Sequence, residues 1–542
     1  MIVCLAALPA LVSAPPASAA RGFKFGVTSA EVRARSAILW AKSTRTGPVL
    51  LQVRRKGSFK SCVLRRAAFR RAKRRRAPRE RIALLRAKRT RDLTVQRKVG
   101  GLRPGTRYRY RFCRRGGRSA VGRFRTAPRL GANATIRFAW SGDQDAQPRP
   151  GRKRPHWNNF EILNRMRSER NHFNLILGDW IYSDSSVPGV TRRAITVPQK
   201  WQKYRQNLAR PPLSRLRTAG AVYNHWDDHE FINDFSRQES RQDLGIPIGP
   251  EKLYRNGVRA FRDYAPVTYS RRDGIYRKVR WGKNLELFFL DERSFRSAKA
   301  SAGGTCDNPP GSGDPDLAPT APQTPHRDTF GLLIPQLLNP PPPACVSRIN
   351  DPNRTLLGAR QLARFKQAVR GSTATFKVIV NEVPIQQFYA LPYDRWEGYE
   401  PERQEVLTYL RDNVSNVIFL TTDVHANMVN DARLQTLEVG GPVNTGILDV
   451  TTGPIATKSF EKEVDDVAGA GFGELARTAF FQPPPPGGVG MQCSAMDVFS
   501  YGQVTVSGSQ LRIDLKDVNG NPVREGTDGS GPACAPVVIN AG

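Results

Sequence analysis

The 542-residue sequence lacks several features that would assign it to a common class of protein. After residue 20 no segment stays apolar for about 18 residues, so none predicts a membrane-spanning helix. The seven cysteines include no C-x-x-C pair, so the sequence offers no thiolate zinc site. No internal repeat is apparent, which excludes a repeat architecture. Because 39% of the residues are hydrophobic, the chain can bury a large core and is not a disordered tail.

Acidic residues are scarce, since 47 Asp and Glu stand against 85 Lys and Arg, and the net charge is +38. The excess is uneven: residues 54–91 hold 18 Lys or Arg and a single acid, Glu80. Such a run is either a solvated arm or a surface for an anionic partner. Teichoic acid, nucleic acid and phospholipid are the anionic partners that fit it.

The N-terminus is apolar and then rich in Pro and Ala, and Ala17-Ser18-Ala19 precedes Ala20 as a small-residue cleavage site. Residues 1–20 therefore resemble a secretory signal peptide, although they lack a basic start, which suggests an initiation site upstream. The alternative is a frayed apolar tail. We expect a protein that is secreted or associated with the cell envelope.

Removal of this leader discards Cys4 and leaves six cysteines. An even number of cysteines in an exported protein favours disulfides, and fifteen connectivities are formally open. Proximity in the sequence favours pairing Cys62 with Cys113, Cys306 with Cys345, and Cys493 with Cys534.

The chain divides into two regions of different pattern. Residues 24–127 contain short alternating strands between Gly and Pro, which predicts a small β-sandwich with the basic run 54–91 inserted between two strands. In residues 134–516 apolar strands alternate with amphipathic helices, which predicts an α/β domain. That domain carries a Pro- and Gly-rich insertion at 303–344, and residues 517–542 follow it as a C-terminal tail.

Six predicted strands of the α/β domain are each followed by polar residues of the kinds that bind ligands. Parallel strands end at a common edge, and ligands bind beyond that edge. Each cluster by itself is an ordinary loop start, but all six together indicate a site. The residues are Asp143 and Asp145; Gly178, Asp179 and Tyr182; Asp227, Asp228 and His229; Asp291 and Arg293; Asn381 and Glu382; and Asp423 and His425.

The stretch HWDDHE at 225–230 sets two adjacent carboxylates beside His229 at the end of an apolar strand. Burial of an unpaired carboxylate is costly, and a metal cation is the usual compensation. The alternative is a solvated acidic turn with a hydrogen-bonded histidine.

The candidate ligands are carboxylates, imidazoles and one phenol, without cysteine. Oxygen and nitrogen donors suit Fe, Mn, Zn or Ca. Tyr182, three residues after Asp179, is distinctive because a phenolate is a good ligand for ferric iron, whose charge lowers the pKa of the phenol. The alternative for Tyr182 is a core tyrosine with a hydrogen-bonded hydroxyl.

Four motifs resemble those of the alkaline phosphatase D family, secreted metallophosphatases related to the purple acid and calcineurin-like enzymes. They are GDWIYSD (178–184), WDDHEFIND (226–234), LDERSFRS (290–297) and TDVHANM (422–428), and the resemblance covers about 24–516. It implies a layered α/β/β/α domain preceded by a β-sandwich. It also implies hydrolysis of phosphomonoesters and phosphodiesters with ferric iron and calcium.

The resemblance assigns roles to single residues. Asp179 would be the bridging carboxylate and Tyr182 would bind iron, while Asp228, Asp423 and His425 would be further ligands. His229 would stand beside the phosphate, protonating the leaving oxygen or stabilising the transition state. We expect Arg293 to contact phosphate oxygens in a bidentate manner, with a salt bridge to Asp291 as its alternative. Weaker substrate-binding candidates are Asn233, Asn381 and Asp145.

The sequence departs from the family pattern at two positions. SGDQD (141–145) stands where many members have Ser-Cys-Gln, so Asp143 replaces the thiolate that binds iron in them. Thr422 stands where Gly is usual. Iron is thus less firmly implied than hydrolysis, and Zn or Mn stays open.

These observations predict a secreted phosphoesterase in which metal-bound hydroxide attacks phosphorus in line. The competing hypothesis is a non-enzymatic protein that binds polyanions or the cell envelope through 54–91. The four intact residues Asp179, Asp228, Asp423 and His425 argue against it. A preference for monoesters or diesters, the natural substrate and the oligomeric state stay open.

Overall fold

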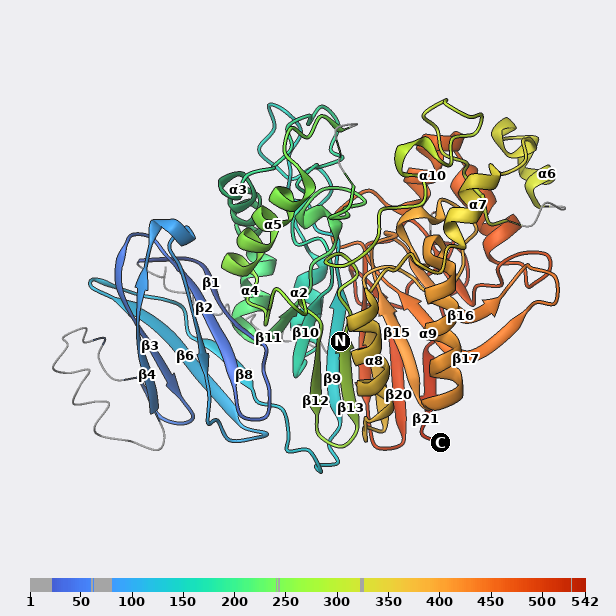
Figure 1. Ribbon diagram of the computed structural model, residues 1–542. Coiled ribbons are helices and arrows are strands. Elements are labelled where there is room, and N and C mark those ends of the chain that lie inside the picture. The colour runs from blue at the N-terminus through green and yellow to red at the C-terminus, as the bar shows by residue number, and fades with distance from the viewer. Residues whose placement is uncertain are drawn as a thin grey trace, which may run out of the picture.

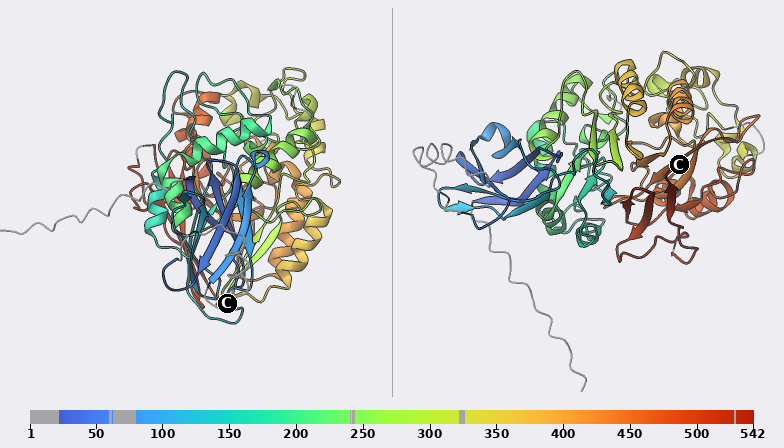
Figure 2. Two further views of the ribbon diagram at one scale, coloured as in Figure 1. Left: turned by 90° about the vertical axis from the view of Figure 1, so that its left-hand side faces the viewer. Right: turned by 90° about the horizontal axis from the view of Figure 1, so that it is seen from below.

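The computed structural model describes residues 22–59, 62, 80–239, 241, 244–321, 326–527 and 529–542. The leader predicted at 1–20 and residues 63–79 of the basic run lie outside these described residues. Two large β-sheets lie between groups of helices, and a smaller sheet lies beside them, in blue at the left of Figure 1 (Figures 1 and 2).

The first large sheet has nine strands, and its central strands β9, β10 and β11 are parallel. Its order is β21 (Val537–Asn540), β20 (Gln510–Asp517), β19 (Ser500–Val506), β9 (Ile136–Ser141), β10 (Phe173–Ile176), β11 (Ala221–Asn224), β1 (Phe23–Ala30), β2 (Ala37–Ser43) and β5 (Thr94–Val99).

The second large sheet has seven strands, of which β13, β14, β15 and β17 are parallel. Its order is β12 (Arg277–Trp281), β13 (Leu285–Phe289), β14 (Phe376–Val380), β15 (Val417–Thr421), β17 (Val443–Thr451), β16 (Asn427–Gln435) and β18 (Cys493–Ala495).

Side-chain alternation along the strands builds three packed interfaces. In β14, Phe376, Val378 and Val380 face the core between the two sheets, whereas Ile379 faces the helices. The first sheet alternates in the same way, because Phe138 and Trp140 of β9 point inward and Ala139 points outward. The α/β/β/α layering predicted from the sequence is confirmed.

Helices cover the outer face of each sheet. The first group packs on the nine-stranded sheet and comprises α2 (Ile162–Ser168), α3 (Val197–Leu208), α4 (Pro211–Ala219) and α5 (Pro250–Tyr264). The second packs on the seven-stranded sheet and comprises α8 (Ala359–Arg370) and α9 (Glu400–Asn413). The remaining helices are α6 (His326–Gly331), α7 (Pro343–Ile349), α10 (Phe460–Ala468) and α11 (Phe472–Ala476). No helix among the described residues is both long and apolar enough to cross a membrane.

The N-terminal region is a two-sheet structure joined to the α/β domain. Its second sheet contains β4 (Glu80–Ala87), β3 (Gly47–Arg54), β6 (Arg107–Arg114), β7 (Gly117–Arg118) and β8 (Gly122–Arg125). Strand β1 pairs in parallel with β11, so its first sheet continues into the nine-stranded sheet. Residues 80–87 form a regular strand with β3, so the insertion predicted at 54–91 is shorter than the sequence suggested.

The C-terminal residues 517–542 are not a simple tail. Strand β21 pairs with β20 at the sheet edge, and Cys534 is bonded to Cys493 of β18. The other disulfides join Cys62 to Cys113 and Cys306 to Cys345. All three pairs are those favoured by sequence proximity.

Candidate metal centre and catalytic crevice

The carboxyl ends of parallel strands in both sheets meet at one crevice of about 790 Å³. Loops after β10 and β11 of the first sheet and after β15 of the second line it, and helix α10 contributes to one wall. This is the end of an α/β sheet where ligands bind. The residues predicted from the sequence that line it are Asp179, Tyr182, Asp228, His229, Asn233, Asp423 and His425.

Four of the predicted ligand residues have a left-handed backbone conformation, which costs side chains other than glycine about 1–3 kcal/mol each. The φ angles of Asp143, Asp179, Asp423 and His425 are 61°, 40°, 67° and 53°. The chain is tightly packed here, because a Cβ added to Gly142 would lie 1.8 Å from a backbone oxygen. Strain of this kind concentrates at functional sites.

Acidic and imidazole groups of the described residues converge in four overlapping sets, with the potential ligand atoms of each set within 4.8 Å of one another. Asp179 belongs to two of the sets and Asp228 to three. Shared carboxylates of this kind can bridge neighbouring cations. The sets are Asp143, Asp179 and His425; Asp179, Asp228 and His229; Asp227, Asp228 and Asp423; and Asp228, Asp234 and Asp394.

Asp143 shows most directly that these residues fit a cation. Its side chain is fully buried, and neither carboxylate oxygen has a hydrogen-bond partner among the described residues. Burial raises the pKa of Asp143 to about 7, against the opposing effect of His425. An unpaired buried carboxylate is costly unless a positive charge compensates it. A metal ion bound by Asp143, Asp179 and His425 would supply that charge.

Tyr182 joins the same set through His425. Its phenol oxygen lies 2.8 Å from Nε2 of His425, whose Nδ1 lies 3.0 Å from a carboxylate oxygen of Glu463 on α10. Burial, reinforced by Asp179 and Asp143, raises the pKa of Tyr182 well above its ordinary value. The phenol therefore keeps its proton unless a cation stabilises the phenolate.

His229 is oriented by a carboxylate that the sequence analysis did not single out. Its Nδ1 lies 2.6 Å from Oδ1 of Asp184, and its ring lies 4.1 Å from that of Tyr182, centroid to centroid. Burial opposes protonation, but Asp184, Asp228 and Asp179 outweigh it and raise the pKa of His229 well above its ordinary value. These carboxylates therefore favour the protonated imidazole at the crevice.

Comparison with known protein families gives a result that agrees with this geometry. The family model for PhoD-like phosphatase matches residues 151–487, which is more than half of the chain. The chain belongs to the PhoD-like phosphatase family. The model for the PhoD-like phosphatase N-terminal domain matches residues 10–128. The predicted family is confirmed, and membership supports phosphoesterase activity.

Known relatives resemble this chain in sequence or in fold over most of their length. Alkaline phosphatase D of Bacillus subtilis (strain 168) is 23% identical over 461 residues, which cover 78% of this chain and 68% of the relative. A solved structure of PhoD covers 97% of this chain and 92% of its own, with 20% identity and a TM-score of 0.68. Purple acid phosphatase PPD1 from yellow lupin (Lupinus luteus) seeds covers 96% of this chain and 74% of its own, with 10% identity and a TM-score of 0.53.

Arg293 does not line the crevice of this PhoD-like phosphatase, so the structure does not place it against a substrate phosphate. Its side chain is fully buried, and its Nε donates a hydrogen bond to Asp227. Its terminal nitrogens lie 2.7 Å from Asp394 and 3.6 Å from Asp423. The buried guanidinium therefore neutralises the acidic cluster. Its ion-pair partners are these carboxylates and not Asp291, the partner considered as the alternative.

The three weaker candidates have different places. Asn233 is exposed on the crevice wall, and its backbone N–H donates to Asp184. Asn381 is fully buried and donates to the carbonyl of Val383, away from the crevice. Asp145 is also buried, and its carboxylate accepts hydrogen bonds from Gln147 and Ser185. Burial thus leaves Asn381 and Asp145 with structural partners instead of an exposed position in the crevice.

Sequence reasoning overlooked several acids of the site, and it noted Asp227 without giving that residue a role. Asp184, Asp227 and Asp234 lie inside the motifs GDWIYSD and WDDHEFIND, so their position in those motifs was a signal for them. Asp394 and Glu463 had no such signal, because the first lies in a loop between β14 and α9 and the second on helix α10.

Sequence reasoning also missed two arginine side chains at the mouth of the crevice. Arg192 and Arg193 line the crevice, and neither makes an ion pair or hydrogen bond within the part of the chain that the structure describes. Uncommitted guanidinium groups at an acidic crevice are suited to an anionic ligand.

Proposed function

We propose that this chain is a metal-dependent phosphoesterase that acts on phosphate monoesters, diesters or both. The observation that carries the proposal is the sharing of Asp179 and Asp228 among adjacent ligand sets at the crevice. Carboxylates that are shared in this way can hold two cations a few Å apart. Enzymes that hydrolyse phosphate esters use such pairs of cations.

We assign the ligands by their donor chemistry. Asp143, Asp179, His425 and Tyr182 would hold ferric iron, because phenolate and imidazole join carboxylates there. Asp227, Asp228 and Asp423 offer only oxygen, which calcium prefers. Zinc or manganese fits the same donors, and elemental analysis distinguishes these alternatives. When bound, such cations make water a nucleophile at neutral pH and offset the charge of the phosphate.

The protein's own groups supply proton transfer and orientation. Asp184 holds Nδ1 of His229, so Nε2 is left to give its proton to the leaving oxygen as the ester P–O bond breaks. Arg293 keeps Asp227, Asp394 and Asp423 close together despite their mutual repulsion. Arg192 and Arg193 would bind a charged part of the substrate at the crevice mouth.

The test is turnover of p-nitrophenyl phosphate and bis(p-nitrophenyl) phosphate by protein before chelation, after chelation and after return of single metals. We expect chelation to abolish turnover. Addition of iron with calcium, or of another first-row metal, should restore it. Full activity of verified metal-free protein would contradict the proposal. The ratio of the two rates gives the preference between monoester and diester.

We also infer that the protein is exported, which the three disulfides support. N-terminal sequencing of protein from the culture medium should find cleavage after residue 20. Accumulation of uncleaved, reduced chain inside the cell would contradict export.

The basic run is proposed to recruit an anionic polymer. Strands β3 and β4, which flank residues 63–79, lie on the side of the molecule away from α10 (Figure 1). Exchange of the Lys and Arg residues of 65–79 for Ser should lower turnover of a polymeric phosphodiester and spare a small aryl phosphate. The difference should vanish at high salt. Equal losses on both substrates would contradict recruitment.

A further inference from the structure

A second cavity, of about 230 Å³, adjoins the catalytic crevice. Its walls come from the Pro- and Gly-rich insertion, from the segment 389–391 and from the region of α10 and α11. For comparison, an apolar cavity of about 150 Å³ stays dry and binds benzene. The cavity therefore has room for an apolar group larger than a benzene ring. The apolar side chains that line it include Leu317, Phe330, Ile334, Val467, Phe472 and Phe480.

The few polar residues of this cavity are all engaged elsewhere. Arg327 binds both carboxylate oxygens of Asp316 and donates to backbone carbonyls as well. Tyr389 donates to Glu438, and His326 contacts a backbone oxygen of Pro486. Glu463, the remaining one, pairs with His425. Because each polar side chain of the lining already has a partner among the described residues and the rest of the lining is apolar, the cavity favours hydrocarbon over a polar ligand.

The cavity and the crevice share part of their lining. The shared residues are Ala390, Leu391, Phe460, Glu463 and Val464. Helix α10 makes the connection, because one face carries Phe460, Val464 and Val467 while Glu463 reaches 3.0 Å from Nδ1 of His425. A molecule whose phosphate occupies the crevice can therefore extend an attached group into the cavity.

The shared wall also contains strained backbone. Tyr389 and Leu391 have φ of 58° and 45°, a conformation that bulky side chains rarely adopt. Contacts hold both residues in place: the Tyr389 hydroxyl lies 2.9 Å from Glu438, and the Leu391 N–H donates to the carbonyl of Leu317 at 2.7 Å. Strain maintained at such a point is typical of ligand-binding segments.

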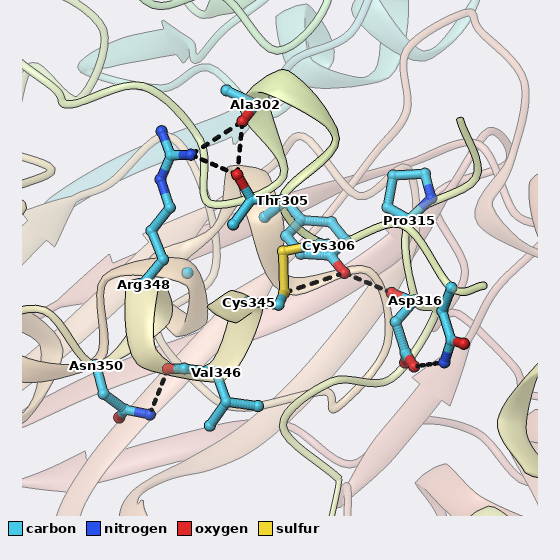
Figure 3. The surroundings of a disulfide bond; sticks show 12 residues. Ala302, Thr305, Cys306, Pro315, Asp316, Cys345, Val346, Arg348 and Asn350 are labelled. Atoms are coloured by element: carbon cyan, nitrogen blue, oxygen red, sulfur yellow. Dashed lines mark hydrogen bonds between the residues drawn. A yellow bond between two sulfur atoms is a disulfide. The ribbon is translucent and has the colours of Figure 1, made fainter. Parts of the chain in front are cut away.

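The insertion that forms one wall is anchored at both ends. The disulfide between Cys306 and Cys345 closes it, and Asp316 accepts from the Tyr393 hydroxyl at its backbone oxygen (Figure 3). Asp316 is in turn the partner of Arg327 in the cavity wall. The cavity is thus a constructed feature and not a gap beneath an unanchored loop.

Several exposed apolar side chains belong to these lining segments or adjoin them in the sequence. Leu332 and Leu333 lie between the lining residues Phe330 and Ile334, and Leu332 is 80% exposed. Leu338 and Val467 are exposed as well. Clustered exposed apolar side chains mark binding sites for apolar ligands.

We propose that this cavity binds the hydrocarbon chain of a phosphoester substrate, so that the enzyme prefers lipid-like esters over short ones. The proposal rests on the phosphoesterase function proposed above, because the crevice must hold the phosphate. The hydrocarbon chain of the substrate contacts the apolar face of α10 and the insertion, while its phosphate stays beside His229 and His425.

The test uses alkyl phosphates and alkyl p-nitrophenyl phosphates with methyl, butyl and octyl chains. Each buried methylene is worth about fourfold in binding, from ~0.8 kcal/mol. The kcat/KM of at least one series should therefore rise by about 100-fold or more from methyl to octyl. Calorimetry with methylphosphonate and octylphosphonate should show the same preference in binding, independently of turnover.

The variant Val467→Asp places a charge at the cavity and should reduce the octyl-to-methyl ratio to below about tenfold. Ala468→Trp, which fills the cavity, should do the same. The matched controls Val439→Asp and Ala363→Trp alter exposed sites outside the cavity lining and should keep the wild-type ratio. Hydrolysis with no dependence on chain length, together with equal phosphonate binding, would overturn the inference. Failure of every ester in both series would instead count against the proposed function.

Discussion

The phenol oxygen of Tyr182 lies 2.8 Å from Nε2 of His425, and this contact joins loops that follow strands of two different sheets. Residue 182 follows β10 of the nine-stranded sheet, and residue 425 follows β15 of the seven-stranded sheet. The site therefore exists only when both sheets are packed together.

Tyr182→Phe should remove a visible absorption band from protein purified without chelator. A phenolate bound to ferric iron gives a charge-transfer band, and phenylalanine has no oxygen with which to form one. Tyr204→Phe is the control, because Tyr204 is an equally buried tyrosine outside the crevice lining. Colourless wild-type protein that is fully active with only Ca, Zn or Mn would reject iron and leave hydrolysis intact.

Asp184→Asn should shift the pH profile of kcat/KM. The Asp184 carboxylate helps raise the pKa of His229, and activity that needs protonated His229 falls as pH rises through that pKa. Loss of the carboxylate charge lowers this pKa, so the falling limb should move to lower pH. Asp273→Asn, at a half-buried carboxylate outside the crevice lining, should leave the profile in place.

His229→Ala provides the companion measurement. We expect turnover to fall by roughly 10²–10⁴-fold, as for loss of a general acid, with the metal content unchanged. A variant that loses metal would show that His229 is a ligand, as its place beside Asp179 and Asp228 allows.

Arg293→Gln should destabilise the protein strongly. It leaves Asp227 and its acidic neighbours without their buried counter-ion, a change that typically costs about 3–5 kcal/mol. Arg364→Gln breaks a partly exposed pair with Asp273 and should cost less than about 1 kcal/mol. The measurement is the melting temperature of each metal-free variant compared with that of metal-free wild type. Equal melting temperatures would show that Arg293 does not neutralise the cluster.

Lys200→Met should change how stability depends on pH. Burial lowers the pKa of Lys200 to about 7, so between pH 7 and its ordinary value near 10.5 the unfolded chain binds the proton that the native chain has released. Wild-type stability should therefore rise with pH across this window relative to the variant. Melting temperatures at pH 7, 8.5 and 10 test the sign, and Lys462→Met, at an exposed lysine, is the control. A constant difference between wild type and Lys200→Met would mean that Lys200 titrates normally.

Much of the fold was readable from local patterns. Strands such as 376–380 are short apolar runs. The polar residues that follow each run lie at the same edge of the sheet because parallel strands share a direction. Strand β4 was missed because its apolar residues 82–85 stand between Arg81 and Arg86, in a run whose charge dominated its interpretation. Strand β21 was missed because an edge strand of four residues leaves little periodicity.

The site was less readable where it depends on three-dimensional neighbours. The burial of Arg293 follows from carboxylates on three other loops, which no spacing in the sequence reveals. Glu463 reaches His425 only because α10 packs over the end of the seven-stranded sheet. The apolar cavity had no sequence signal either, since its walls come from three separate segments, within 317–337, 389–391 and 460–481.

The most direct test of the account is the metal content per chain measured together with turnover for wild type and Asp179→Asn. Asp179 belongs to two adjacent ligand sets, so the variant should lose most of its bound metal and most of its turnover together. The control Asp263→Asn changes a buried carboxylate that pairs with Arg259 outside the crevice and should retain both. An Asp179→Asn protein that keeps its full metal content and wild-type turnover would contradict a shared metal centre at this crevice.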